Sequence, residues 1–205
     1  QAARTTCIKP AGTTSLVLGT SSGIHAWHND YYIRRLRVGK NEPIYKYLKE
    51  NNPDLVEDEY FRPHDTAVIE IPQSAPKGSI LRTESAFDLL KRVKKVATEW
   101  VKPGHRAGSN THNVSATISL KQSDWKKAGE WMWDNRDCYN GLSVLPYDGG
   151  TYTQAPFEDI TKTEFNKRVK SLNDIDLSNI VETTDETDLS GELACSGGSC
   201  EITNL

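Results

Sequence analysis

The sequence is short of cysteine, methionine and long apolar runs, and each shortage excludes a class of protein. Its 205 residues include four cysteines, at positions 7, 138, 195 and 200, and one methionine, Met132. These cysteines are too few and too scattered for a secreted disulfide scaffold, so we expect a reducing, cytoplasmic location. No apolar run approaches the roughly 18 residues that a membrane span requires, so we expect no membrane partner.

The first residues lack the features of a translation start and of a secretory leader. The chain begins QAARTTCIKP, without Met and without a basic segment followed by an apolar one. We therefore expect these residues to be a piece of a longer protein.

Basic and aromatic residues are missing from the last part of the chain. Residues 173–205 carry eight acidic side chains and no Lys or Arg, so a total charge of −3 leaves +5 for residues 1–172. A segment of this composition cannot bury enough apolar surface to offset the entropy lost on ordering. We predict a folded body over residues 1–172 and a flexible acidic arm over residues 173–205.

The body shows alternating helix and strand patterns. Apolar residues recur at three- and four-residue spacings from Phe87 to Val101, which predicts an amphipathic helix over 85–101 that ends before Pro103. A second helix is expected over 123–137, with Ser123 as its N-cap. Shorter helices are expected at 42–51 and 161–172, and strands at 66–73, 112–120 and 139–147. This alternation favours an α/β layered or barrel fold.

Small residues dominate the segment PAGTTS, residues 10–15, which follows an extended stretch and precedes an apolar one. Bare amides and three hydroxyls at the start of a helix form a site suited to phosphate. The alternative is an ordinary strand-to-helix turn capped by Thr or Ser. The segment is not a nucleotide P-loop, because no Gly-Lys-Ser/Thr follows it.

Two of the four cysteines lie near the end of the chain, where Cys195 and Cys200 flank Ser-Gly-Gly-Ser. Half of a zinc site and two idle surface thiols are alternative interpretations. A zinc site would need two further Cys or His ligands, and the arm contains none.

Several long strings in this sequence resemble, in the same order, the C-terminal part of the adenosylcobalamin-dependent (class II) ribonucleotide reductases that act on triphosphates. These strings are KPAGTTSLVLGTSSGIHAWH, YYIRRLRV, FRPHDTAVIEIPQ, GSNTHNVSATISL, YNGLSVLPYDGGTYTQAPFED and CSGGSC. The resemblance covers essentially the whole chain. It implies an α/β fold that forms the C-terminal portion of a ten-stranded barrel, followed by the flexible tail.

The resemblance also implies an activity, which is the reduction of ribonucleotides to deoxyribonucleotides by thiyl-radical chemistry. Adenosylcobalamin would be the cofactor of the assembled enzyme. The residues implied to bind the substrate phosphates are Ala11, Gly12, Thr13, Thr14 and Ser15. Ala11 replaces a serine that is usual in the family, so one hydroxyl contact is expected to be lost.

The arm acquires a role through the same resemblance. Each turnover of this family oxidises two active-site thiols to a disulfide, and a second, mobile pair must reduce it. Cys195 and Cys200 are implied to be this pair, themselves reduced by thioredoxin or glutaredoxin. We expect no nucleic acid among the partners.

The remaining cysteines of the family's chemistry precede the phosphate loop, so the resemblance implies an N-terminal part of the reductase as a partner. That part would carry the radical cysteine and the active-site pair. Cys7 and Cys138 match neither role, and we expect them to pack as small apolar side chains.

The histidines outside the predicted strands are expected to lie in loops. His25 and His28 are expected in a loop and not in a metal site, and His105 and Arg106 in a solvated loop.

A stand-alone thiol–disulfide carrier and a phosphate-binding module without chemistry of its own remain alternatives to the reductase. Disulfide exchange with thioredoxin and nucleotide titration would separate them.

Overall fold

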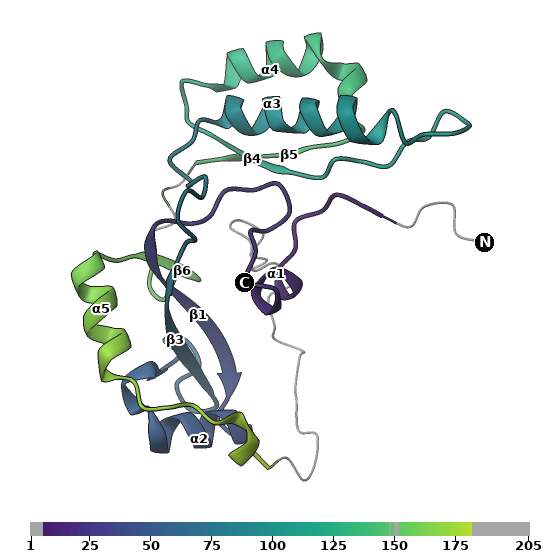
Figure 1. The fold of residues 1–205 in the computed structure, drawn as a ribbon. Helices are drawn as coiled ribbons and strands as arrows, with labels where there is room; N and C mark the ends of the chain where they lie inside the picture. The colour runs from purple at the N-terminus through teal and green to yellow at the C-terminus, as the bar shows by residue number, and fades with distance from the viewer. Residues whose placement is uncertain (1–5, 148, 150–151, 182–205) are drawn as a thin grey trace. The chain divides into compact units, whose positions relative to one another are not determined.

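The computed structural model describes residues 6–147, 149 and 152–181, which contain both helices and strands (Figure 1). This mixed content confirms the α/β class. The chain divides into two compact units. The described part of the first unit comprises residues 6–27, 78–147 and 149, and that of the second comprises residues 28–77 and 152–181.

The second unit is built on a four-stranded antiparallel sheet in the order β2-β3-β1-β6. Its strands are β1 (Tyr31–Gly39), β2 (Val56–Asp58), β3 (Thr66–Ser74) and β6 (Phe157–Asp159). The central strands β1 and β3 pair along their whole length, from Tyr31 opposite Ser74 to Gly39 opposite Thr66. The sequence predicted β3, but β1, β2 and β6 were not predicted as strands.

Two helices cover this sheet, and both were predicted. Helix α2 (Pro43–Asn51) begins with a proline at its first position, where the missing amide hydrogen costs no helical bond. Helix α5 (Lys162–Ser171) has Thr161 as its N-cap, and the Thr161 hydroxyl accepts a hydrogen bond from the Glu164 amide at 3.1 Å. Short 3-10 turns lie at η1 (Pro53–Leu55) and η4 (Leu177–Asn179). The core between α2 and the sheet contains Val38, Leu48, Leu55, Val56, Ala67 and Ile69.

Glu70 on β3 joins helix α5 to the sheet. Its carboxylate lies 2.6 Å from the Arg35 guanidinium on β1 and 3.0 Å from that of Arg168 on α5. The Arg35 side chain is 9% exposed and also pairs with Glu158 on β6. Burial alone would lower the pKa of Arg35, but the hydrogen bonds that its guanidinium donates to these carboxylates raise it.

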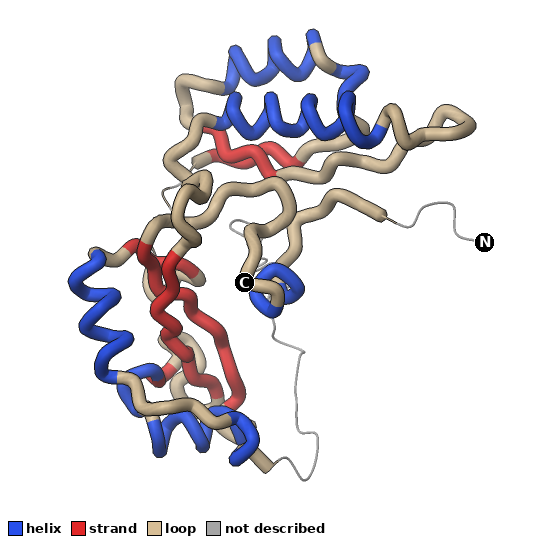
Figure 2. The backbone as a smooth tube through the Cα atoms, viewed as in Figure 1, coloured by secondary structure: helices blue, strands red, loops and turns tan. Residues whose placement is uncertain are grey.

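The first unit contains a parallel pair of strands joined by a helix. Strands β4 (Thr117–Leu120) and β5 (Ser143–Pro146) pair in parallel, with α4 (Trp125–Asp134) and the turn η3 (Arg136–Cys138) between them. Helix α3 (Ala86–Val96) continues into one π-helical turn, η2 (Ala97–Val101). Both helices lie on one side of the strand pair in Figure 2.

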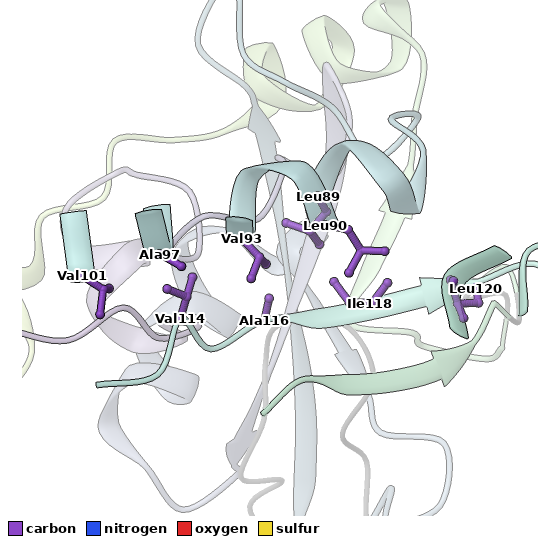
Figure 3. Close-up of a cluster of buried hydrophobic side chains, with 10 residues drawn as sticks. Leu89, Leu90, Val93, Ala97, Val101, Val114, Ala116, Ile118 and Leu120 are labelled. Atoms are coloured by element: carbon purple, nitrogen blue, oxygen red, sulfur yellow. The ribbon is translucent and has the colours of Figure 1, made fainter. Parts of the chain in front are cut away.

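The core of this unit lies between α3 and the segment that leads through β4 (Figure 3). Buried residues from the helix and its π turn are Leu89, Leu90, Val93, Ala97 and Val101; those facing them are Val114, Ala116, Ile118 and Leu120. The helix predicted over 85–101 is therefore confirmed. Ser85 and Asp88 form a capping box at its start, each side chain bonding the other residue's amide.

Two details of this unit differ from the prediction. The N-cap of α4 is Asp124 and not Ser123, because the Ser123 hydroxyl donates to the Asp124 carboxylate at 3.1 Å and does not accept from a helix amide. The strands are also shorter than the segments 112–120 and 139–147, since only four residues on each side pair.

Among the described residues, the strands form one four-stranded and one two-stranded sheet, so the ten-stranded barrel stays a prediction. None of the helices in these residues has the length and apolar character needed to cross a membrane.

Candidate phosphate-binding loop

The predicted phosphate loop lies between two attachments to the segment that leads into β4. Before the loop, Ile8 forms a parallel bridge with Val114, and its carbonyl accepts from the Ser115 amide at 3.1 Å. The chain then runs into the short helix α1 (Thr13–Val17), as the sequence predicted. After the loop, the ring of His25 contacts the amide of Thr117.

The amides of the loop differ in how they are used. The N-cap of α1 is Gly12, and no side chain caps the helix. The amides of Thr13, Thr14 and Ser15 occupy the first helical positions, which have no acceptor within the helix. The amide of Ala11 instead donates to Ser22 Oγ at 2.9 Å, so it holds the loop in shape.

The Ser15 hydroxyl also serves the loop itself. Ser15 is buried, and its Oγ lies within hydrogen-bond distance of the Ala11 carbonyl and 2.8 Å from the Gly12 carbonyl. Thr14 is exposed. The backbone amides and the exposed side chain of Thr14 are therefore the groups of the loop that a ligand could contact. The Ser15 hydroxyl instead bonds the loop's own carbonyls.

A tight approach of two backbone segments closes the loop. Gly23 has a positive φ of 60°, and a Cβ at this position would lie 2.3 Å from the Lys9 carbonyl oxygen. Gly19 has almost the same φ, 59°, but nothing lies within 4 Å of its Cβ position. At Gly23, therefore, both the backbone conformation and the lack of space disfavour a side chain, whereas at Gly19 only the backbone conformation does.

The two neighbouring histidines serve different elements. His25 Nδ1 lies 2.8 Å from the Ser22 carbonyl, and its Nε2 lies 3.0 Å from the Thr117 amide. His28 belongs to the second unit, where Nε2 lies 2.9 Å from an Asp159 oxygen and the ring stacks on Phe157. The described residues include no group of three or more His, Cys, Asp or Glu side chains placed to hold a metal ion. The ring of His105 contacts a carbonyl of its own loop, that of Gly108, at 2.7 Å.

The cysteine predictions have different outcomes. Cys195 and Cys200 lie outside the described residues. Cys138 packs against the core of the first unit, as predicted. The prediction that Cys7 packs is wrong, because Cys7 is exposed. Its neighbour Ile8 packs against the core, and successive side chains of an extended segment point to opposite sides.

Residues 173–181, the described part of the predicted arm, contact α2. The Asn173 side chain donates to the Asn51 carbonyl at 2.6 Å, and the Asp176 amide donates to the Tyr47 hydroxyl at 3.0 Å. Asp176 also accepts hydrogen bonds from the Ser178 hydroxyl and amide, which lower the pKa of its carboxyl. The proposal of a flexible arm is therefore confined to the residues after 181.

A small cavity lies beside the π turn of α3, with His112, Cys138 and Tyr139 among its lining residues. Its volume is about 20 Å³, which accommodates about one water molecule. His112 Nε2 is buried and has no hydrogen-bond partner among the described residues. This cavity does not fit a corrin, so it gives no support for a cobalamin contact in this chain.

From the sequence, His25 was expected only to lie in a loop and not in a metal site, and Ser22 and Gly23 had no predicted role. The signal was present in the string SSGIH, since a serine–glycine turn followed by a polar ring is typical of a hydrogen-bonded turn. What the sequence could not supply was the distant partner, Thr117, which lies 92 residues along the chain.

Comparison with known proteins finds relatives that match almost the whole of this chain. The chain is 29% identical over 195 residues to the adenosylcobalamin-dependent ribonucleoside-triphosphate reductase of Euglena gracilis, covering 91% of this chain and 25% of that protein. It is 27% identical over 200 residues to the reductase of the same name from Lactobacillus acidophilus, covering 96% of this chain and 26% of that protein. No family model matches the chain.

A solved structure agrees with these relatives. The crystal structure of a B12-dependent (class II) ribonucleotide reductase is 27% identical to this chain, with a TM-score of 0.66, and the match covers 80% of this chain and 22% of the other. The chain thus spans about a quarter of the length of the relatives that it matches. The resemblance predicted from the sequence motifs is therefore confirmed: over almost its whole length the chain is similar to adenosylcobalamin-dependent (class II) ribonucleotide reductases.

Proposed function

We propose that this chain supplies the substrate-phosphate loop and the dithiol shuttle of an enzyme that reduces ribonucleoside triphosphates to deoxyribonucleotides. One observation carries the proposal. A loop of small residues, whose helix-start amides have no intrahelical acceptor, lies in a chain that matches triphosphate reductases over almost its whole length. The fold supplied would be the C-terminal portion of a ten-stranded barrel.

The loop suits a polyanion for steric and electrostatic reasons. Ala11 and Gly12 leave the backbone open to close approach, and the amides of Thr13, Thr14 and Ser15 provide donors. Residues 1–172 carry a net charge of +5, which favours an anionic ligand. Ser15 would act by fixing the loop, since its hydroxyl bonds the loop's own carbonyls.

The shuttle would act by two thiol–disulfide exchanges. A thiolate of Cys195 or Cys200 attacks one sulfur of the oxidised active-site pair and forms a mixed disulfide. The second tail thiol then attacks the tail sulfur of that bond, so the active-site pair leaves as two thiols and the tail becomes the disulfide. Two electrons and two protons pass inward, and a thioredoxin- or glutaredoxin-type protein restores the tail.

The radical cysteine and adenosylcobalamin are assigned to an N-terminal part of the enzyme. Adenosylcobalamin would supply the radical that starts the reaction in the assembled enzyme. This chain's own task is to bind and orient the triphosphate and to return reducing equivalents.

The proposal is tested by mixing the chain with an N-terminal chain that carries the radical cysteine, adenosylcobalamin, a ribonucleoside triphosphate and a small dithiol. Formation of deoxynucleotide is followed over time. We expect turnover only when both chains are present. Turnover by this chain alone would overturn the division of roles, and the absence of turnover in the mixture would overturn the function.

A further inference from the structure

The phosphate loop is closed at its base by two contacts to one short stretch of chain. Ile8 and His25, at the two ends of the loop, bond the amides of Ser115 and Thr117, which are two residues apart. The Ile8 contact is made by backbone atoms, whereas the His25 contact depends on a side chain. The second contact can therefore be removed by substitution without altering the first.

The two partners of His25 determine where its ring carries a proton. The Thr117 amide can only donate, so Nε2, 3.0 Å away, must be the unprotonated nitrogen. The Ser22 carbonyl can only accept, so Nδ1, 2.8 Å away, must carry the hydrogen. Both bonds exist together only in the neutral Nδ1–H tautomer.

Ser22 connects this ring to the phosphate loop. Its carbonyl accepts from the His25 amide at 3.1 Å as well as from the His25 ring. Its hydroxyl accepts from the Ala11 amide at 2.9 Å. A continuous set of hydrogen bonds thus runs from Thr117 through His25 and Ser22 to Ala11, the residue before the N-cap of α1.

We propose that His25 is a positioning residue, which in its neutral Nδ1–H form fixes the shape of the loop from Lys9 to Gly23 by linking Ser22 to Thr117. His25 touches no phosphate in this arrangement and acts through Ser22 and Ala11. That the fixed loop serves a triphosphate rests on the proposed function; that His25 fixes the loop does not.

The tautomer is tested directly in the full chain by the nitrogen chemical shifts of the His25 ring at neutral pH. We expect the signature of a neutral ring protonated at Nδ1. A ring protonated at Nε2 would overturn the proposal, since the Thr117 amide would then have no acceptor.

The positioning role is tested with three variants. His25→Ala removes both ring bonds, His25→Asn retains a donor near the Nδ1 position, and His25→Gln retains an acceptor near the Nε2 position. The control is His64→Ala, which removes an exposed histidine of the second unit. If His25→Ala does not fold, the Asn and Gln variants carry the test, since each lacks only one bond.

The first readout is amide hydrogen exchange, which needs no ligand. In His25→Ala the amides of Ala11 and Thr117 should exchange about tenfold faster, as expected for the loss of a typical hydrogen bond. The amide of Asp88, held by the capping box of α3, should be unchanged, which excludes global destabilisation. Wild-type exchange at Ala11 in all three variants would overturn the proposal.

The second readout is titration with inorganic triphosphate, followed at the amides of Thr13, Thr14 and Ser15. We expect about tenfold weaker binding in His25→Ala and intermediate binding in the Asn and Gln variants. If these amides of the wild-type chain do not respond, the phosphate role in the proposed function fails, while the exchange readout still decides the role of His25. Equal affinity in wild type and His25→Ala would show that the hydrogen bonds of the His25 ring do not contribute to triphosphate binding.

Discussion

The side-chain oxygen of Asn52, at the end of α2, accepts a hydrogen bond from the amide of Asn173 at 2.8 Å, although 121 residues separate the two in sequence. Asn52 is 3% exposed, so the acceptor of this bond is buried, whereas Asn173 itself is exposed. It fixes the chain where α5 has ended and the acidic segment begins. The root of the proposed redox arm is therefore attached to α2.

Replacing Asn52 by Ala should destabilise the second unit. The Asn173 amide would lose its acceptor, and the loss of a typical hydrogen bond costs about 0.5–1.5 kcal/mol. Urea unfolding measures the change. Asn51→Ala is the control, because Asn173 bonds the backbone carbonyl of Asn51, which this change retains. Equal stability of the wild type and Asn52→Ala would contradict the anchoring role.

Acid should loosen the turn at the root of the arm. Hydrogen bonds from Ser178 lower the pKa of Asp176 below its ordinary value of 3.8. A carboxyl with a lowered folded-state pKa stabilises the fold above the unfolded-state value and loses that effect as pH falls through the folded-state value. The Ser178 amide resonance should therefore shift below pH 3.8, and Asp176→Asn should abolish that shift. An unchanged titration in the variant would exclude Asp176 as its cause.

Glu70→Gln should destabilise the second unit by about 1–3 kcal/mol, because Arg35 and Arg168 would each lose a charged hydrogen-bond partner. The control is Glu99→Gln, which removes an exposed pair with Lys95 one helical turn away and should cost less than about 0.5 kcal/mol. Thermal unfolding of both variants gives the comparison. Similar effects of the two changes would argue against a link between α5 and the sheet through Glu70.

Gly23→Ala should weaken triphosphate binding more than Gly19→Ala. Both glycines have φ near 60°, so the backbone strain of an alanine is the same. Only at position 23 would the new Cβ also meet the Lys9 carbonyl. Comparing Gly23→Ala with Gly19→Ala separates the effect of backbone strain from that of displacing the loop. Isothermal titration measures the triphosphate affinity of each variant. Equal affinities would show that closure at Gly23 is not needed for binding.

Replacing Cys195 or Cys200 by Ser should abolish multiple turnover of the assembled enzyme with a thioredoxin system. Activity with a small dithiol should remain, because such a molecule can reach the active site without the tail. Deoxynucleotide formation is measured under both reductants. Equal loss under both would remove these cysteines from the shuttle role.

The elements with strong local signals were predicted from the sequence. Helix α3 has regular apolar spacing and a capping serine, and the turn at residues 10–15 leads into a helix as its small residues indicated. The α/β class followed from the alternation of such elements. These features depend on residues close together in the chain.

Elements that depend on distant partners were missed. Strand β1 carries Arg34, Arg35 and Arg37, whose charges obscure the strand pattern. In the fold, Arg35 pairs with Glu70 on β3 and Arg37 with Glu59. Strands β2 and β6 have three residues each, too few for a periodicity. The hydrogen bonds between His25 and Thr117 and between Asn52 and Asn173 each join residues far apart in the chain. Neither bond could therefore be predicted from a local sequence pattern.

The attachment at Asn173 limits the distance over which the thiols of Cys195 and Cys200 could move in the proposed shuttle. The contacts with α2 end within residues 173–181, and thirteen residues lie between Val181 and Cys195. That length spans at most about 50 Å when fully extended, and a flexible coil of the same length averages about 20 Å. If these residues form the proposed flexible tether, it would keep a thiol at an effective concentration in the millimolar range around its root. Within the assembled enzyme, reduction of the active site would then be a first-order step, with a rate independent of the concentration of that assembly.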